Sequence, residues 1–193
     1  MMTGAAEPTI LFVCTGNICR SPYMEYRLRA MLTERGVPDV SIGSAGTRAL
    51  EGHTIAEPMA RRLREHGIDA SGFRASALGL QMLDAAGVVV TATREHRREV
   101  VRHRHDLAER VFTLTQLARL LDASASDSTT GAAGPVADLL AAAHAARGVT
   151  TAGTAREDDM EDPWQRSRRS YRRVANRIDE LLIPMATRLV AGG

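Results

Sequence analysis

The sequence predicts a single-domain α/β fold in which helices cover both faces of a parallel, four-stranded sheet. Short continuous apolar runs, typical of buried parallel strands, alternate with segments whose apolar residues recur at helical spacing. A chain of 193 residues also suffices for one domain with a sizeable core. Alternating strands and helices imply right-handed crossovers, and such sheets bind ligands at the carboxyl ends of their strands.

The expected elements follow one another in a regular order. The predicted strands cover residues 9–13, 40–45, 88–92 and 110–114. The predicted helices cover residues 22–35, 58–66, 75–86, 94–101, a short segment ending at 121, 136–147 and 170–190. Gly36 and Gly67 follow two of these helices as C-caps. Pro184 should kink or break the last helix, because it removes a backbone donor.

The composition is that of a globular protein, with 44% hydrophobic and 25% charged residues. The net charge of +2 argues against a nucleic-acid partner, and no apolar stretch approaches the roughly 18–20 residues that span a bilayer. Residues 1–8 carry neither a basic cluster nor an apolar core of a secretion signal, so we expect a cytoplasmic protein without a membrane partner. Two cysteines five residues apart form neither a disulfide scaffold nor a four-ligand metal site.

The most informative segment directly follows the first predicted strand and reads Cys14-Thr15-Gly16-Asn17-Ile18-Cys19-Arg20-Ser21-Pro22. Such a loop can curl so that its backbone N–H groups and the Arg20 guanidinium surround one anion, with the Cys14 sulfur beneath it. The helix that starts at Pro22 and the Arg20 charge both favour a thiolate. We therefore predict a phosphate cradle formed by Thr15, Gly16, Asn17, Ile18, Cys19 and Arg20. The alternative is an ordinary buried cysteine in a strand-to-helix turn.

This segment resembles the signature loop of the low-molecular-weight protein tyrosine phosphatases. Three further stretches lie where that family would place them: Ser44-Ala45-Gly46-Thr47, Gly67-Ile68-Asp69 and Asp162-Pro163-Trp164. The resemblance implies hydrolysis of phosphomonoesters through a phosphocysteine intermediate, with no cofactor and no metal. It covers most of a single phosphatase domain, residues 1–193. Residues 122–155 resemble an insertion, partly a mobile loop because it is rich in Ser, Ala, Thr, Gly and Asp.

Phosphoryl transfer to sulfur also requires an acid for the leaving oxygen, and Asp162 is the candidate. It lies in an acidic run, residues 157–162, where like charges favour keeping a proton on one carboxyl. The same carboxylate would then activate water. The acidic run could instead be a solvated loop, and Asp158 and Asp159 are the other candidates for the acid.

Asn17, Ser21 and Ser44 resemble the residues that support the loop in this family. Ser21 could instead be only a helix cap, and Ser44 only a turn residue. The chain departs from the family at Phe73, where a histidine is common before the arginine. A supporting histidine is therefore missing.

Leu50 and Trp164 are the candidate walls of a substrate cleft. Many family members have an aromatic residue shortly after the Ser-Ala-Gly-Thr stretch, whereas this chain has Arg48-Ala49-Leu50. Trp164 could instead be a core residue. The altered walls predict a more open pocket, which would also accept substrates other than phosphotyrosine.

Other residues admit two interpretations each. Cys19 either forms a reversible, protective disulfide with Cys14 or packs in the core. His96, His103 and His105 suggest a metal site, but arginines surround them and no acidic residue has the spacing of a metal ligand. An arginine-rich face of the last helix is either solvated or docks an acidic substrate protein: Arg169, Arg172, Arg173 and Arg177.

The leading functional hypothesis is a cysteine-based phosphatase that acts on phosphotyrosine or small aryl phosphates, so the partner is a phosphorylated protein or a small phosphomonoester. Three alternatives remain open. One is an arsenate reductase that uses an external thiol, because no cysteine follows Cys19. The others are a small-metabolite biosynthetic phosphatase on the same fold and a phosphate-binding regulator without turnover.

Overall fold

A four-stranded parallel sheet forms the centre of the protein, as predicted. The computed structural model describes residues 9–37, 40–124, 134–148, 150–151 and 153–192. The sheet order is β2-β1-β3-β4, and every neighbouring pair is parallel. The strands are β1 (Thr9–Cys14), β2 (Ile42–Gly46), β3 (Ala86–Thr91) and β4 (Val111–Thr113).

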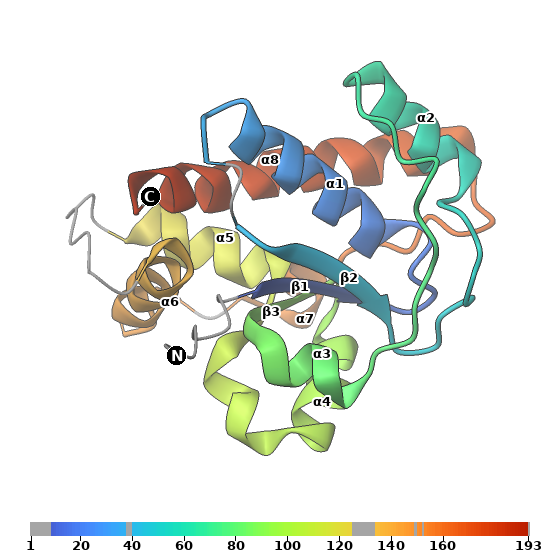
Figure 1. Cartoon of the computed structure of the whole chain (residues 1–193). Helices are drawn as coiled ribbons and strands as arrows, with labels where there is room; N and C mark the ends of the chain where they lie inside the picture. The colour runs from blue at the N-terminus through green and yellow to red at the C-terminus, as the bar shows by residue number, and fades with distance from the viewer. Residues whose placement is uncertain (1–8, 38–39, 125–133, 149, 152, 193) are drawn as a thin grey trace, which may run out of the picture.

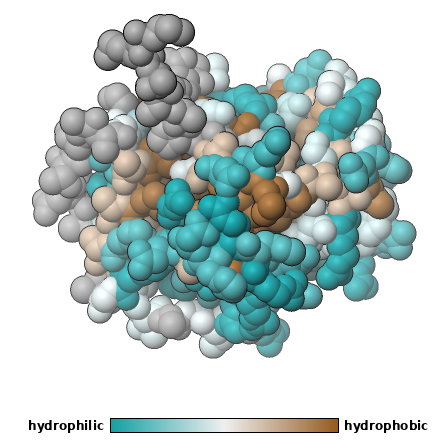
Figure 2. Space-filling model, turned by 60° about the horizontal axis from the view of Figure 1, so that its bottom comes forward, coloured by the Kyte–Doolittle hydropathy of each residue, from teal (hydrophilic) through white to brown (hydrophobic). Residues whose placement is uncertain are grey.

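Helices cover both faces of this sheet (Figure 1). On one face lie α1 (Arg20–Thr33), α2 (Glu57–Glu65), α5 (Leu114–Ala123), α6 (Pro135–Ala146) and α8 (Arg168–Ala191). On the other lie α3 (Leu80–Ala85), α4 (Arg94–His103) and the 3₁₀ helix η1 (His105–Arg110). The short α7 (Ala155–Asp158) precedes α8. Figure 2 brings the α3–α4 side forward, where hydrophilic surface prevails over smaller hydrophobic patches.

The alternation of side chains along β1 explains the two layers of helices. Ile10 and Phe12 point into the larger core, which lies on the face of the sheet covered by α1, α2, α5, α6 and α8. Leu11 and Val13 point into the smaller core under α3, α4 and η1. All four side chains are buried, so β1 is apolar on both faces, as the continuous run predicted. Because β1 lies between β2 and β3, the loop that follows β1 lies at the middle of the edge formed by the carboxyl ends of the strands.

The helix predicted over residues 75–86 is wrong in its first half. Only Leu80–Ala85 is helical, and the preceding residues run extended beside the end of β2. The Gly46 N–H donates to the Ser76 carbonyl at 3.0 Å, and the Leu78 N–H donates to the Gly46 carbonyl at 2.9 Å. These backbone groups are paired with β2, so they do not enter a helix.

Pro184 does not break the last helix, because α8 continues from Arg168 to Ala191. An interior proline costs about 3 kcal/mol. Met185 and Leu189, which follow it, are fully buried against the core, and each buried side chain of this kind contributes about 1.5–3 kcal/mol. The burial beyond Pro184 thus outweighs its cost.

The predicted helix 136–147 is confirmed as α6, which packs against α5 and α8. The insertion proposed for residues 122–155 stays a prediction, and residues 125–133, 149 and 152 lie outside the described part of the chain. Within the described ranges, no helix combines the length and the apolar character that crossing a membrane requires.

Candidate active site

The candidate site is the loop between β1 and α1, at the carboxyl end of the sheet. β1 ends at Cys14 and α1 begins at Arg20, two residues before the predicted start of the helix. Both side chains are buried. Asn17 adopts a left-handed backbone with φ of 52°, which curls the loop back on itself. The loop therefore holds a cysteine and an arginine together at a helix N-terminus.

The carbonyl groups of the loop point outward, where neighbouring segments bind them. Three successive carbonyls accept backbone hydrogen bonds of 2.9–3.0 Å: those of Cys14, Thr15 and Gly16, from the N–H groups of Thr47, Arg48 and Leu50. The Ile18 carbonyl likewise accepts from the Ala56 N–H at 2.8 Å. Because the N–H of a trans peptide points opposite to its carbonyl, the N–H groups that follow these carbonyls point inward. This is the geometry of an anion cradle.

Gly46 allows the segment after β2 to approach the loop closely. A Cβ atom on Gly46 would lie 2.5 Å from the Thr15 carbonyl oxygen and 3.0 Å from the Asn17 nitrogen. Any other residue would therefore displace the cradle. The Ser-Ala-Gly-Thr stretch thus contributes backbone as well as the Ser44 side chain.

Asn17 connects the supporting residues predicted from the sequence. Its Nδ2 donates to the hydroxyls of Ser21 and Ser44, both at 2.9 Å. Its Oδ1 accepts from the Ser76 N–H at 2.8 Å. The Ser21 hydroxyl lies 3.0 Å from the Cys14 sulfur, where its proton can stabilise a thiolate. The structure thus brings all three predicted supporting residues together.

Glu25 extends this network and was missed by the sequence reasoning. Its Oε2 accepts from the Ser44 hydroxyl at 2.6 Å, and its Oε1 accepts from Arg29 at 2.7 Å. The available signal was its position one helical turn after Ser21. Phe73, which replaces the family's histidine, instead packs edge-on against Tyr26 with ring centres 6.1 Å apart.

Arg20 is the buried cation of the site. Its guanidinium donates to Asp162 Oδ2 at 2.7 Å and to the Met160 carbonyl at 3.3 Å. Its Nε atom is also buried, yet it has no hydrogen-bond partner within the described residues. A buried N–H without a partner is costly, so this atom is suited to an anion bound in the cradle.

Asp162 is the only carboxyl of the acidic run that the structure brings to Arg20. Its Oδ1 also accepts from the Trp164 N–H at 3.1 Å. The neighbouring carboxyls have other partners: Glu157 with the Thr154 N–H, Asp158 with Arg119, Asp159 with the Arg94 N–H, and Glu161 with Arg173. The crowd of uncompensated charges expected around Asp162 is therefore absent among the described residues, and Asp158 and Asp159 point elsewhere.

A cavity of about 170 Å³ opens above Cys14. Its walls combine the loop with Arg48, Leu50, Asp162 and Trp164. Trp164 is 44% exposed and Leu50 is 38% exposed, so neither is a core residue. The two predicted wall residues thus lie at the mouth of the cavity, together with the apolar Ile18.

His96 lies beside the cradle rather than in a metal site. Its Nε2 is 2.9 Å from the Thr15 hydroxyl and its Nδ1 is 2.7 Å from the Thr93 hydroxyl. Burial, and then the charge of Arg20, lower the pKa of His96 to about 4, so the ring is neutral. No cluster of potential metal ligands occurs in the part of the chain that the structure describes. The signal for His96 was its place just beyond the carboxyl end of β3.

Cys19 is buried behind the loop as a free thiol, as is Cys14. Burial, and then the charge of Cys14, raise the pKa of Cys19 to about 12. Cys19 is therefore protonated at neutral pH, which leaves Cys14 as the candidate nucleophile.

These features define a cysteine-based phosphatase, and comparison with known families agrees. The family model described as low molecular weight phosphotyrosine protein phosphatase matches residues 9–127. The chain belongs to this family and is a phosphatase.

Particular relatives carry different names. A protein-arginine-phosphatase of Geobacillus stearothermophilus is 36% identical over 118 residues, which are 61% of this chain and 76% of that protein. A probable low molecular weight protein-tyrosine-phosphatase, EpsP, of Ralstonia solanacearum is 35% identical over 109 residues, 56% of this chain and 72% of EpsP. The crystal structure of the low molecular weight protein tyrosine phosphatase from T. tengcongensis superposes with a TM-score of 0.69 at 27% identity, covering 92% of this chain and 97% of that one.

Proposed function

We propose that this protein hydrolyses phosphotyrosine or small aryl phosphates in two steps, through a phosphocysteine at Cys14. The observation that carries the proposal is the buried Arg20, whose Nε has no partner among the described residues, in a loop whose carbonyls point outward. Such a site offers its N–H groups to the equatorial oxygens of a phosphoryl group. One preorganised donor of this kind is typically worth about 3–4 kcal/mol in the transition state.

In the first step, the Cys14 thiolate attacks phosphorus in line and forms the S–P bond. The bond from phosphorus to the ester oxygen breaks, and that oxygen takes the proton of the Asp162 carboxyl. In the second step, the Asp162 carboxylate accepts a proton from water while the water oxygen attacks phosphorus. The S–P bond breaks, phosphate leaves and the thiolate is restored. The chain's own groups meet each developing charge, so the scheme calls for no metal or cofactor.

The walls of the cavity favour an aromatic leaving group. Ile18, Leu50 and Trp164 present apolar surface around the opening, and a phenyl ring gains by stacking on such walls. The substrate is accordingly a phosphorylated protein or a small aryl phosphomonoester. We place the reaction in the cytoplasm, where both thiols stay reduced.

Phosphoarginine is the second candidate, because the Geobacillus relative is named a protein-arginine-phosphatase. The guanidinium of phosphoarginine is polar and would lie between the same apolar walls. We therefore expect a higher kcat/KM for a phosphotyrosine peptide than for the phosphoarginine peptide of the same sequence. The reverse order would favour the second candidate.

The mechanism is tested by hydrolysis of para-nitrophenyl phosphate in the presence of a chelator. The parent protein should be active, Cys14→Ser inactive, and Asp162→Ala strongly slowed. Activity that survives in Cys14→Ser, or that disappears with the chelator, would overturn the mechanism. Arsenate reduction that depends on an added thiol, without phosphatase turnover, would favour the reductase alternative.

A further inference from the structure

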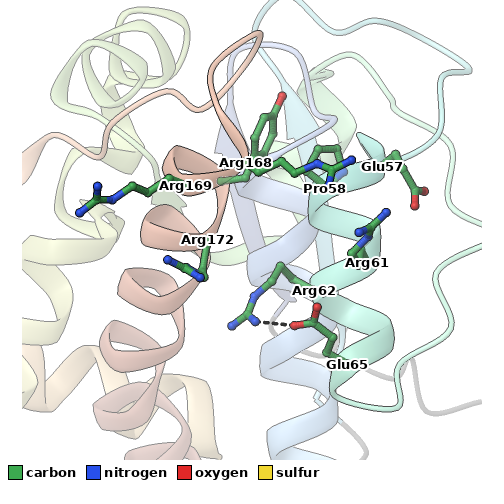
Figure 3. A pocket seen from close by; sticks show the side chains of 9 residues that line it. Glu57, Pro58, Arg61, Arg62, Glu65, Arg168, Arg169 and Arg172 are labelled. Carbon is green, nitrogen blue, oxygen red and sulfur yellow. Dashed lines mark hydrogen bonds and ion pairs between the residues drawn. The ribbon is translucent and has the colours of Figure 1, made fainter.

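A second concave site lies between α2 and α8, outside the cradle. Its volume is about 430 Å³. Charged side chains from both helices line it, together with one proline and one tyrosine: Glu57, Pro58, Arg61, Arg62, Glu65, Arg168, Arg169, Tyr171 and Arg172. We call this site the arginine groove. Figure 3 shows its arginines rising from the two facing helices.

The positive charge of the arginine groove is not compensated within it. Arg62 pairs with Glu65, and Arg64, outside the groove, pairs with Glu57. Four exposed arginines remain without an ion-pair partner in the described part of the chain: Arg61, Arg168, Arg169 and Arg172. Because the whole chain has a net charge of only +2, this is a local concentration of charge.

The groove lies at two helix N-termini, of which that of α8 adds to the positive potential. α2 begins at Glu57 and α8 begins at Arg168, and both residues line the groove. Each N-terminus carries a partial positive charge; the carboxylate of Glu57 offsets it at α2, whereas the first turn of α8 contains no acidic residue. The groove is therefore suited to carboxylates or other anions. A solvated face of a single helix would be convex, whereas this site is concave and has arginines from two helices.

The arginine groove adjoins the active-site loop. Tyr171 lines the groove and belongs to the same buried core cluster as Ile18 and Cys19 of the cradle. α2 starts directly after Ala56, whose N–H binds the Ile18 carbonyl at 2.8 Å. Arg61 follows Ala56 by five residues, or about 8 Å along the helix. Residues two to five positions from a bound phosphotyrosine lie about 7–17 Å along an extended peptide, a range that includes this distance from the loop to Arg61.

We propose that the arginine groove binds acidic side chains that flank the phosphorylated tyrosine of a protein substrate. This inference rests on the proposed phosphatase function, because the phosphotyrosine fixes the peptide in the cradle. Carboxylates of the flanking segment pair with Arg61 of α2 and Arg172 of α8, and the pairing lowers KM. A small aryl phosphate does not reach the groove, so its hydrolysis is independent of these arginines.

The test compares two phosphotyrosine peptides that differ only in their flanks, with glutamates or glutamines two to five positions on either side. The parent should hydrolyse the glutamate peptide with a kcat/KM about fivefold higher, through KM, as expected for two partly exposed ion pairs. In Arg61→Gln/Arg172→Gln this preference should disappear, while para-nitrophenyl phosphate and the glutamine peptide react as before. Added salt should also reduce the preference.

Arg98→Gln/Arg102→Gln is the matched control. It removes two exposed arginines from α4, on the opposite face of the sheet, and changes the net charge equally. The control should keep the full preference. If both variants lose the preference equally, it arises from the overall charge of the protein, and the proposal that the arginine groove binds the acidic side chains is contradicted.

The two hypotheses fail in different ways. If the parent hydrolyses both peptides equally well, the arginine groove is overturned and the phosphatase function stands. If it hydrolyses neither peptide but still hydrolyses para-nitrophenyl phosphate, phosphotyrosine is excluded as the substrate, and this inference falls with it.

Discussion

Gly46→Ala probes how tightly the segment after β2 shapes the cradle. The new Cβ would lie 2.5 Å from the Thr15 carbonyl oxygen, whereas real Cβ contacts stay above 3.0 Å. The carbonyl therefore has to retreat by at least about 0.5 Å, since steric contacts at this distance are strongly repulsive. That displacement also strains the 2.9 Å hydrogen bond from the Arg48 N–H.

Both stability and catalysis should suffer. Forcing a methyl group into a packed site costs about 1–3 kcal/mol, which urea unfolding of the variant would measure. Shifting the cradle donors should lower kcat/KM for para-nitrophenyl phosphate about 10- to 100-fold, since a 1 Å misplacement costs about 100-fold. Competitive inhibition by inorganic phosphate should weaken in parallel, because phosphate uses the same donors.

Gly43→Ala is the matched control on the same strand. A Cβ there meets no atom within 4 Å, and the residue lies three positions before Gly46 in β2. This variant should keep the parent's stability, kcat/KM and phosphate inhibition. A Gly46→Ala variant that also kept all three would refute the argument that the cradle is shaped by close backbone contact.

Four further results are expected. Arg20→Lys should lower kcat/KM by about two to three orders of magnitude, because an ammonium lacks the planar fork that binds two phosphate oxygens; activity near the parent's would contradict this. Trp164→Ala should raise KM about fivefold for aryl phosphates and leave alkyl phosphates unaffected, which steady-state kinetics would reveal. Cys19→Ser should keep phosphatase activity but become more prone to permanent peroxide inactivation, whereas equal recovery of both proteins by a dithiol would exclude a protective disulfide. The pKa of His96 is about 4 in the folded protein and 6.5 in the unfolded chain, so the unfolded state binds a proton first as the pH falls. Between pH 6.5 and 4, urea unfolding of the parent should therefore show a loss of up to about 3 kcal/mol of unfolding free energy that His96→Gln does not show.

The sequence predicted the parts of the fold whose signals are local. The apolar runs located β1 and β3, because a buried parallel strand is apolar on both faces, and the two edge strands were expected at 40–45 and 110–114 from the alternation of strands and helices. The helix predicted for residues 75–79 was wrong, because their extended conformation depends on pairing with Gly46, which is distant in sequence. The helix break predicted at Pro184 was also wrong, because the burial of the residues that follow it is a tertiary effect.

The candidate site divides in the same way. Cys14 and Arg20 lie in one contiguous motif, and Asp162 belongs to a second short motif, so all three could be proposed from the sequence. The like-charge argument for Asp162 was wrong, because the neighbouring carboxyls have partners elsewhere. Glu25 and His96 act through contacts with Ser44 and Thr15 that arise only when β2 and β3 flank β1. The arginine groove likewise requires α2 and α8 to face each other, which a helix-by-helix analysis does not reveal.

The most direct test of the central hypothesis is to identify the phosphorylated atom during turnover. Asp162→Ala, mixed with para-nitrophenyl phosphate and quenched rapidly, should carry up to one phosphate per chain on the sulfur of Cys14, because water attack is slowed when the base is missing. Cys14→Ala should carry none and should not turn over. Phosphate bound to any other residue, or steady turnover by Cys14→Ala, would contradict the mechanism.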